Sequence, residues 1–199
     1  MEDGIKKNDV IFIAGANGMV GSAIERLIKS NSSNLVLTPT RQELDLSSTD
    51  DVFSWFKKYK PNIVINAAAK VGGILANSSY PVDFLLKNLR IQNNIIEASF
   101  KFDTNRLLFL GSSCIYPKNC KQPIREEYLM TSSLEPTNEF YALAKISGLK
   151  LCEAYRKQYG FDAIALMPTN LYGPGDNFCK ENSHVIPSLI RKFSKAVRD

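Results

Sequence analysis

An α/β fold with a doubly wound, parallel sheet is predicted from three features of the sequence. Short apolar runs rich in β-branched residues alternate with longer amphipathic stretches along the chain. The short runs are apolar at consecutive rather than alternate positions, which indicates strands buried on both faces. A glycine-rich turn, GANGMVG, directly follows the first of them. Together these features favour a parallel sheet with helices packed on each side.

Strands and helices are expected to alternate along the chain. We expect strands at residues 10–14, 35–38, 63–66, 107–110 and 163–167. We expect one helix between each pair of successive strands, at residues 18–29, 51–59, 81–100 and 139–158. The segments 111–125 and 168–187 contain proline and glycine and are typical of long loops that carry function.

The composition favours a globular protein that binds a small molecule. The 199 residues are 44% hydrophobic and 23% charged, which suits a folded domain. The net charge of +5 comes from scattered lysines and arginines, so we do not expect a nucleic-acid partner. Four cysteines without a C-x-x-C pair, together with one histidine, argue against a metal site and favour a reducing cytoplasm. We expect neither a signal peptide nor a membrane span.

The glycine-rich turn predicts a site for the diphosphate of a dinucleotide. Its three glycines allow a sharp turn, a close approach of backbone N–H groups to an anion, and tight seating of a helix whose N-terminus is partially positive. The same glycines also suit a tight strand–helix connection, but their position after the first strand favours a cofactor in a Rossmann-type domain. The residues assigned to this site are Gly15, Asn17, Gly18, Met19, Val20 and Gly21.

The end of the second strand indicates which dinucleotide is bound. No acid stands there to bind the ribose hydroxyls of NAD, whereas Arg41 suits the 2′-phosphate of NADP. Arg41 also fits a solvated surface position, but we favour NADP(H) as the cofactor. Asp45 and Leu46 are expected beside the adenine. Small residues after the third strand are expected along the bridging part of the cofactor, although they also permit close packing: Ala67, Ala68 and Ala69.

Tyr141 and Lys145 form a catalytic signal when they are taken with the glycine turn and the serines after the fourth strand, although a tyrosine and a lysine four apart also occur by chance in many helices. Residues four apart share a helix face, so the Lys145 ammonium is expected near the Tyr141 phenol and is expected to lower its pKa. A tyrosine tuned in this way protonates a carbonyl oxygen as hydride arrives. Ser112 or Ser113, at the end of the fourth strand, is expected to donate a hydrogen bond to the same oxygen. The sequence therefore predicts a carbonyl reductase.

Longer motifs around these residues resemble the extended short-chain dehydrogenase/reductase family. They are FIAGANGMVGSAI, NAAAKVGGILAN, LLFLGSSCIYP, LEPTNEFYALAKISGLKLCEAY, MPTNLYGPGDNF and NSHVIPSLIRKF. The resemblance runs from about residue 9 to residue 193 and is most specific to members that epimerise and reduce a GDP-linked 4-keto-6-deoxy sugar with NADPH. It implies a GDP-linked keto-deoxy sugar as the small-molecule partner.

The resemblance implies roles for residues that would otherwise pass as structural. Taken alone, Cys114 would be a small buried thiol and His184 incidental. In this context Cys114 is implied as the base and His184 as the acid that invert C3 and C5, with positive charge nearby favouring the thiolate. Further implied cofactor contacts are Pro168, Asn170, Leu171, Lys145 and His184. Implied substrate contacts are Val71, Gly72, Ser113, Asn170, Arg191 and Lys192.

The resemblance also implies a longer chain. Members continue with another strand and a region that holds the nucleotide, whereas this sequence ends at Asp199. We expect residues 9–178 to form the dinucleotide-binding domain and residues 179–199 to begin a truncated substrate-binding region, with impaired turnover. The helices at 81–100 and 139–158 are implied to form a homodimer.

Two other functions fit part of the sequence. A sugar-nucleotide 4-epimerase or dehydratase shares the glycine turn, the tyrosine and the lysine, but it has no need of Cys114 with His184. A non-catalytic NADP-binding fragment or module, acting through partners, is favoured by the length of the chain. Proton exchange on a sugar ligand distinguishes the enzyme from the module.

Overall fold

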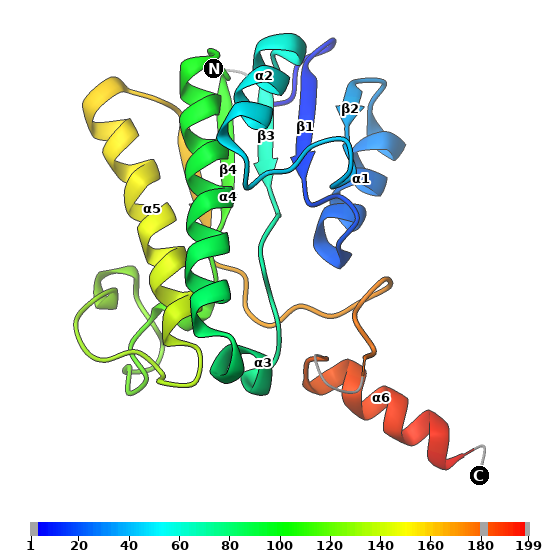
Figure 1. Ribbon diagram of the computed structural model, residues 1–199, viewed down its shortest axis with the longest axis vertical. Helices are drawn as coiled ribbons and strands as arrows, with labels where there is room; N and C mark the ends of the chain where they lie inside the picture. Colours follow the sequence, from blue (N-terminus) through cyan, green and yellow to red (C-terminus); the bar gives the residue numbers. More distant parts are fainter. Residues whose placement is uncertain (1–3, 180–182, 198–199) are drawn as a thin grey trace.

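Figure 1 shows the computed structural model, which describes residues 4–179 and 183–197. Its centre is a sheet whose five strands have the spatial order β2-β1-β3-β4-β5, with every neighbouring pair parallel. The strands are β1 (Val10–Ala14), β2 (Leu35–Leu37), β3 (Ile63–Asn66), β4 (Arg106–Leu110) and β5 (Ala163–Leu166). The predicted doubly wound sheet is therefore confirmed.

The order of the strands determines where a ligand can bind. From β1 the chain passes outward to β2 and then returns to the other side of β1 to form β3. In open parallel sheets of this kind, the connections after neighbouring strands diverge at such a reversal and leave a crevice beyond the carboxyl ends. The glycine turn after β1 lies at this crevice.

Helices cover both faces of the sheet. They are α1 (Met19–Asn31), α2 (Thr49–Tyr59), α3 (Ile74–Ser79), α4 (Pro81–Lys101), α5 (Glu139–Tyr159) and α6 (Val185–Ala196). Two short 3-10 helices, η1 (Ser113–Ile115) and η2 (Glu126–Tyr128), lie in the loops after β4. The four helices expected between strands are confirmed to within two residues at each end. The short elements α3, η1 and η2 were not predicted.

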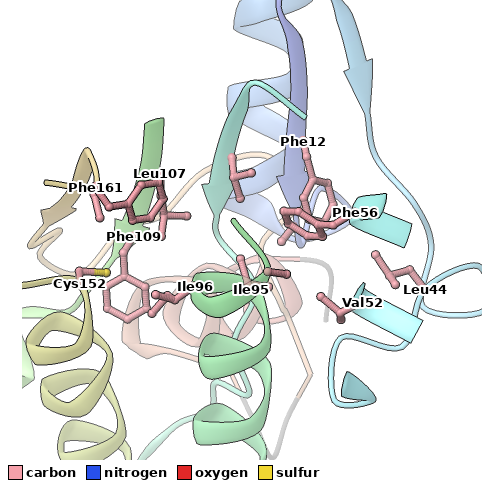
Figure 2. Packing of buried hydrophobic residues seen from close by; sticks show 14 residues of the cluster. Phe12, Leu44, Val52, Phe56, Ile95, Ile96, Leu107, Phe109, Cys152 and Phe161 are labelled. Atoms are coloured by element: carbon pink, nitrogen blue, oxygen red, sulfur yellow. The ribbon is translucent and has the colours of Figure 1, made fainter. Parts of the chain in front are cut away.

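The two faces of β1 have separate cores. Ile11 and Ile13 point to the face covered by α1, where they pack with Ile28 and Ile65. Alternate residues point to the opposite face, where α2, α4 and α5 pack. Figure 2 shows Phe12 and Phe56 together in this second core, with Ile95, Ile96, Leu107, Phe109, Cys152 and Phe161 farther along it. Burial of one such large apolar side chain stabilises the fold by about 1.5–3 kcal/mol. The expected structural role of Cys152 agrees with its burial.

The packing of α5 on α4 positions the Tyr141–Lys145 pair. The two helices lie side by side over β4 (Figure 1). Gln92 of α4 is buried, and its Nε2 donates a 2.6 Å hydrogen bond to the carbonyl oxygen of Ala144. Gly148 permits α5 to pack closely on β4, because a Cβ there would lie 2.5 Å from the Phe109 ring. The turn of α5 that carries Lys145 is thus held against both α4 and β4.

The last described helix, α6, extends away from the sheet in Figure 1. All five strands fall within the expected dinucleotide-binding domain, residues 9–178. Residues 180–182 and 198–199 of the expected second region lie outside the described residues. Within the described part of the chain, no helix has the length and apolarity needed to cross a membrane.

Candidate active site

A cavity of about 530 Å³ lies at the carboxyl ends of the strands. Loops after β1, β3, β4 and β5 contribute to its wall, together with α5 and the start of α6. The predicted residues from the first two loops are Gly15, Gly18, Met19, Val20, Gly21, Ala67, Ala68, Ala69, Val71 and Gly72. Those from the later segments are Ser112, Tyr141, Lys145, Pro168, Asn170, Leu171 and His184. One cavity therefore brings together segments that are distant in the sequence.

The glycine turn is shaped by close backbone contacts. Gly15 has a φ of +81°, and a Cβ on it would lie 2.8 Å from the backbone of Ala68. A Cβ on Gly21 would lie 2.2 Å from the carbonyl oxygen of Gly15. The N-terminus of α1 opens at this turn, and its N-cap residue Gly18 offers no side chain to cap the free N–H groups. This cradle fits an anion such as a diphosphate.

A second cavity of about 360 Å³ adjoins the first and shares Gly15, Ala69 and Ile91 with it. The predicted residues that line it are Asn17, Arg41, Asp45 and Leu46. Asp45 accepts hydrogen bonds from the Oγ and N–H of Ser47, at 2.7 and 3.0 Å. These bonds lower the pKa of Asp45, and the charge of Arg41 adds to the effect. The two adjoining cavities together provide one space for each half of a dinucleotide.

Lys145 is held in the wall of the first cavity. Its Nζ donates a 2.7 Å hydrogen bond to the carbonyl oxygen of Leu110 and lies 4.9 Å from the Phe109 ring centroid. The ring centroid of Tyr141 is 5.8 Å from the same nitrogen. Burial lowers the pKa of Lys145 to about 8, although the neighbouring Cys114 opposes that shift. Lys145 thus changes charge near neutral pH.

The expected lowering of the Tyr141 pKa was wrong for this structure. Burial raises the pKa of Tyr141, and a negative charge on Cys114 raises it further. The physical reason is that removing the phenol from water disfavours the phenolate. Tyr141 therefore keeps its proton and is a donor rather than a base.

The two adjacent serines after β4 differ in their position relative to the cavity. Ser112 lines the cavity and caps η1, where its Oγ accepts from the N–H of Cys114 at 3.5 Å. Ser113 and Cys114 are half-buried and line neither cavity. Burial raises the pKa of the Cys114 thiol, with Ser112 and Lys145 opposing the shift. The expectation that positive charge would favour the thiolate was therefore wrong in its net direction, because desolvation is the larger effect.

Three predicted residues lie on α6 or at its start, and they differ in whether they line a cavity. His184 lines the first cavity as the N-cap residue of α6 and is exposed. Arg191 is half-buried and Lys192 exposed, and neither lines the two cavities. The structure therefore brings His184, but not this basic pair, to the cavity.

Several residues that line the cavities were not predicted. Asn77 lines the first cavity and is buried, and its Nδ2 donates to the carbonyl oxygens of Gly72 and Gly73 at 2.8 and 3.1 Å. Its presence in the motif GGILAN was an available signal. Others include Asp176 and Asn177 in the first cavity and Lys70, Lys87 and Arg90 in the second. Charge alone did not distinguish these lysines and Arg90 from surface residues.

Comparison with known proteins agrees with this arrangement. GDP-L-fucose synthase 1 of Arabidopsis thaliana is 56% identical over 190 residues, which cover 96% of this chain and 59% of that protein. GDP-L-fucose synthase of Escherichia coli (strain K12) is 54% identical over 186 residues, which cover 94% of this chain and 58% of that protein. The crystal structure of a GDP-L-fucose synthetase from Naegleria fowleri bound to NADP matches with a TM-score of 0.87 and 33% sequence identity. The match covers 96% of this chain and 63% of that one.

These relatives confirm the resemblance found in the sequence motifs. The chain spans less than two thirds of the length of each of them. A model of the NAD dependent epimerase/dehydratase family matches residues 11–198, which include the glycine turn, the tyrosine–lysine pair and His184. The chain therefore belongs to the NAD dependent epimerase/dehydratase family.

Proposed function

We propose that the chain carries the cofactor site and catalytic residues of an NADPH-dependent epimerase and reductase. Its substrate is GDP-4-keto-6-deoxy-D-mannose, and its product is GDP-L-fucose. The observation that carries this proposal is the single cavity lined by the glycine turn, Ser112, Tyr141, Lys145 and His184. The GDP-L-fucose synthases with 54–57% identity support the choice of substrate.

The cofactor lies along both cavities in this proposal. The glycine turn and the start of α1 hold the diphosphate, while Arg41, Asp45 and Leu46 hold the adenosine half. Ala67, Ala68 and Ala69 flank the bridge, and Pro168, Asn170 and Leu171 line the nicotinamide end. When bound, NADPH supplies the hydride for reduction at C4.

Tyr141 protonates the C4 oxygen during reduction. Its raised pKa keeps the phenol protonated at neutral pH, so the proton is available as the alkoxide develops. Lys145 places an ammonium beside this oxygen, and its pKa of about 8 keeps most of the population charged at pH 7. The Ser112 hydroxyl donates a hydrogen bond to the same oxygen.

Cys114 and His184 invert C3 and C5. The C4 ketone acidifies the adjoining C–H bonds, so the Cys114 thiolate removes a proton and the electron pair moves onto the C4 oxygen as an enolate. Tyr141, Lys145 and Ser112 stabilise this oxyanion. His184 then delivers a proton to the opposite face. The effect of Cys114 on the pKa values of Tyr141 and Lys145 supports its position beside them.

The remaining substrate contacts follow from the same placement. Val71, Gly72 and Asn170 line the cavity and contact the sugar. Ser113 is assigned to the same substrate, although it lines neither cavity. Arg191 and Lys192 of α6 contact the diphosphate of the substrate. Neither residue lines the two cavities in this structure.

The assembly is a homodimer in the cytoplasm. The first turns of α4 and α5, which lie side by side in Figure 1, expose Val82, Leu86, Phe140 and Leu143. Two copies joining these helices would bury that apolar surface. The four free thiols support a reducing compartment. The partner is a small molecule rather than nucleic acid or a membrane.

Proton NMR of GDP-4-keto-6-deoxymannose in heavy water tests this function. We expect deuterium to enter at C3 and C5 in the presence of the chain, and a reduced product to form only when NADPH is added. Cys114→Ser is expected to abolish the exchange but to leave NADPH binding unchanged. NADPH binding without any exchange above background would instead identify a cofactor-binding module. Exchange retained in Cys114→Ser would show that a group other than Cys114 is the base.

A further inference from the structure

Two arginines from distant parts of the chain line the second cavity. Arg41 follows β2, and Arg90 lies in the middle of α4. Ile91, the neighbour of Arg90, lines both cavities, so this turn of α4 lies where the two cavities meet. Two separate segments of the chain therefore each contribute an arginine to this cavity.

The two lysines of this cavity each interact with a side chain of the protein. Lys87 Nζ forms a 2.9 Å ion pair with Asp83 Oδ2. Lys70 Nζ lies 5.8 Å from the centroid of the Phe84 ring. Neither Arg41 nor Arg90 has an ion pair or hydrogen bond with any other side chain in the described residues 4–179 and 183–197. These two guanidinium groups are thus available to a ligand.

The charge of the cavity favours an anionic ligand. Arg41, Lys70, Lys87 and Arg90 line it against one carboxylate among the described residues, Asp45, whose Oδ1 is engaged by Ser47. The loop wall at Asn17 carries no charge. Like charges on one cavity repel each other unless an anion lies between them. Arginine is well suited to this task, because its planar fork matches the oxygens of a phosphate.

We propose that Arg90 is a second determinant, with Arg41, of the preference for a 2′-phosphorylated adenosine ribose. The inference rests on the proposed dinucleotide site. In it, Arg41 contacts the 2′-phosphate from the β2 side and Arg90 supplies positive charge from α4. The specificity for NADP over NAD is therefore shared between two elements rather than fixed by the end of β2 alone.

Calorimetric titration with adenosine 2′,5′-bisphosphate and 5′-AMP tests the proposal, since the two nucleotides differ by the 2′-phosphate. Wild type is expected to prefer the bisphosphate. Arg90→Gln is expected to reduce this preference about fivefold to tenfold, as for loss of a charge-assisted contact, with 5′-AMP affinity changed less than about twofold. Lys57→Gln, in the last turn of α2 and lining neither cavity, controls for the loss of one positive charge.

Three results would overturn the inference. Equal weakening of both nucleotides by Arg90→Gln would place Arg90 on the adenine, and an unchanged preference would remove it from the site. If the wild type prefers the bisphosphate in either case, the proposed cofactor site stands and only the role of Arg90 fails. If the wild type binds neither NADPH nor the two nucleotides, the proposed function fails with it.

Discussion

Lys145 is buried and the neighbouring Cys114 is half-buried, and burial shifts their pKa values in opposite directions. It lowers the pKa of Lys145 to about 8 and raises that of Cys114 above its usual value. Desolvation disfavours an ammonium and a thiolate alike, so both groups are pushed toward neutrality. The base of the proposed epimerisation is thus scarce at neutral pH, while the cation that stabilises the enolate is still abundant.

The pH dependence of proton exchange follows from these two shifts. Exchange at C3 and C5 without NADPH is expected to rise about tenfold per pH unit between pH 6 and 8, because it requires the thiolate. Above about pH 8 the slope is expected to decrease as Lys145 loses its proton. NMR exchange rates from pH 6 to 9.5 measure this profile. A rate independent of pH from 6 to 8 would mean that a group other than Cys114 is the base.

At the scale of single elements, the turn between β1 and α1 depends on Gly21. A Cβ there would meet backbone atoms, which are less able to move than side-chain atoms. We expect Gly21→Ala to lower the free energy of unfolding by about 1–3 kcal/mol and to weaken NADPH binding about tenfold, because the N–H groups of the turn are displaced. Chemical denaturation and a fluorescence titration of NADPH measure the two effects.

Gly160→Ala is the matched control for this variant. Gly160 ends α5 with a φ of +69°, and apart from its chain neighbours no heavy atom of the described residues lies within 4 Å of a Cβ built on it. We expect a loss of stability of about 1–2 kcal/mol from the left-handed backbone, without any change in NADPH binding. Equal NADPH affinities for Gly21→Ala and wild type would show that the close contact does not shape the site.

Elements and cavities differ in how far the sequence predicts them. The bounds of β1 and β3 were predicted to the residue, since the apolar run of β1 ends before Gly15 and that of β3 ends at the polar Asn66. The helix α3 was missed because six residues show too little periodicity. The pKa directions of Tyr141 and Cys114 depend on burial by several elements, which no local motif records. Arg90 was missed for the same reason, because only the fold brings α4 to the cavity of Arg41.

At the scale of the whole molecule, the first turns of α4 and α5 are expected to join two copies. Leu86→Glu combined with Leu143→Glu places charge in the exposed apolar surface and is expected to convert a dimer into a monomer. Sedimentation velocity measures the change. Leu27→Glu is the control, since Leu27 is 65% exposed on α1. A wild-type chain that sediments as a monomer would contradict the proposed assembly.

The central claim is that one cavity joins the dinucleotide to the carbonyl chemistry of Tyr141. Its most direct test is the transfer of deuterium from C4 of labelled NADPH to C4 of the sugar, followed by mass spectrometry of the product. We expect each product molecule to carry one deuterium in the wild type, and Tyr141→Phe to lower the rate at least about a hundredfold while still binding NADPH. NADPH binding without label in the sugar, or undiminished transfer in Tyr141→Phe, would contradict the claim.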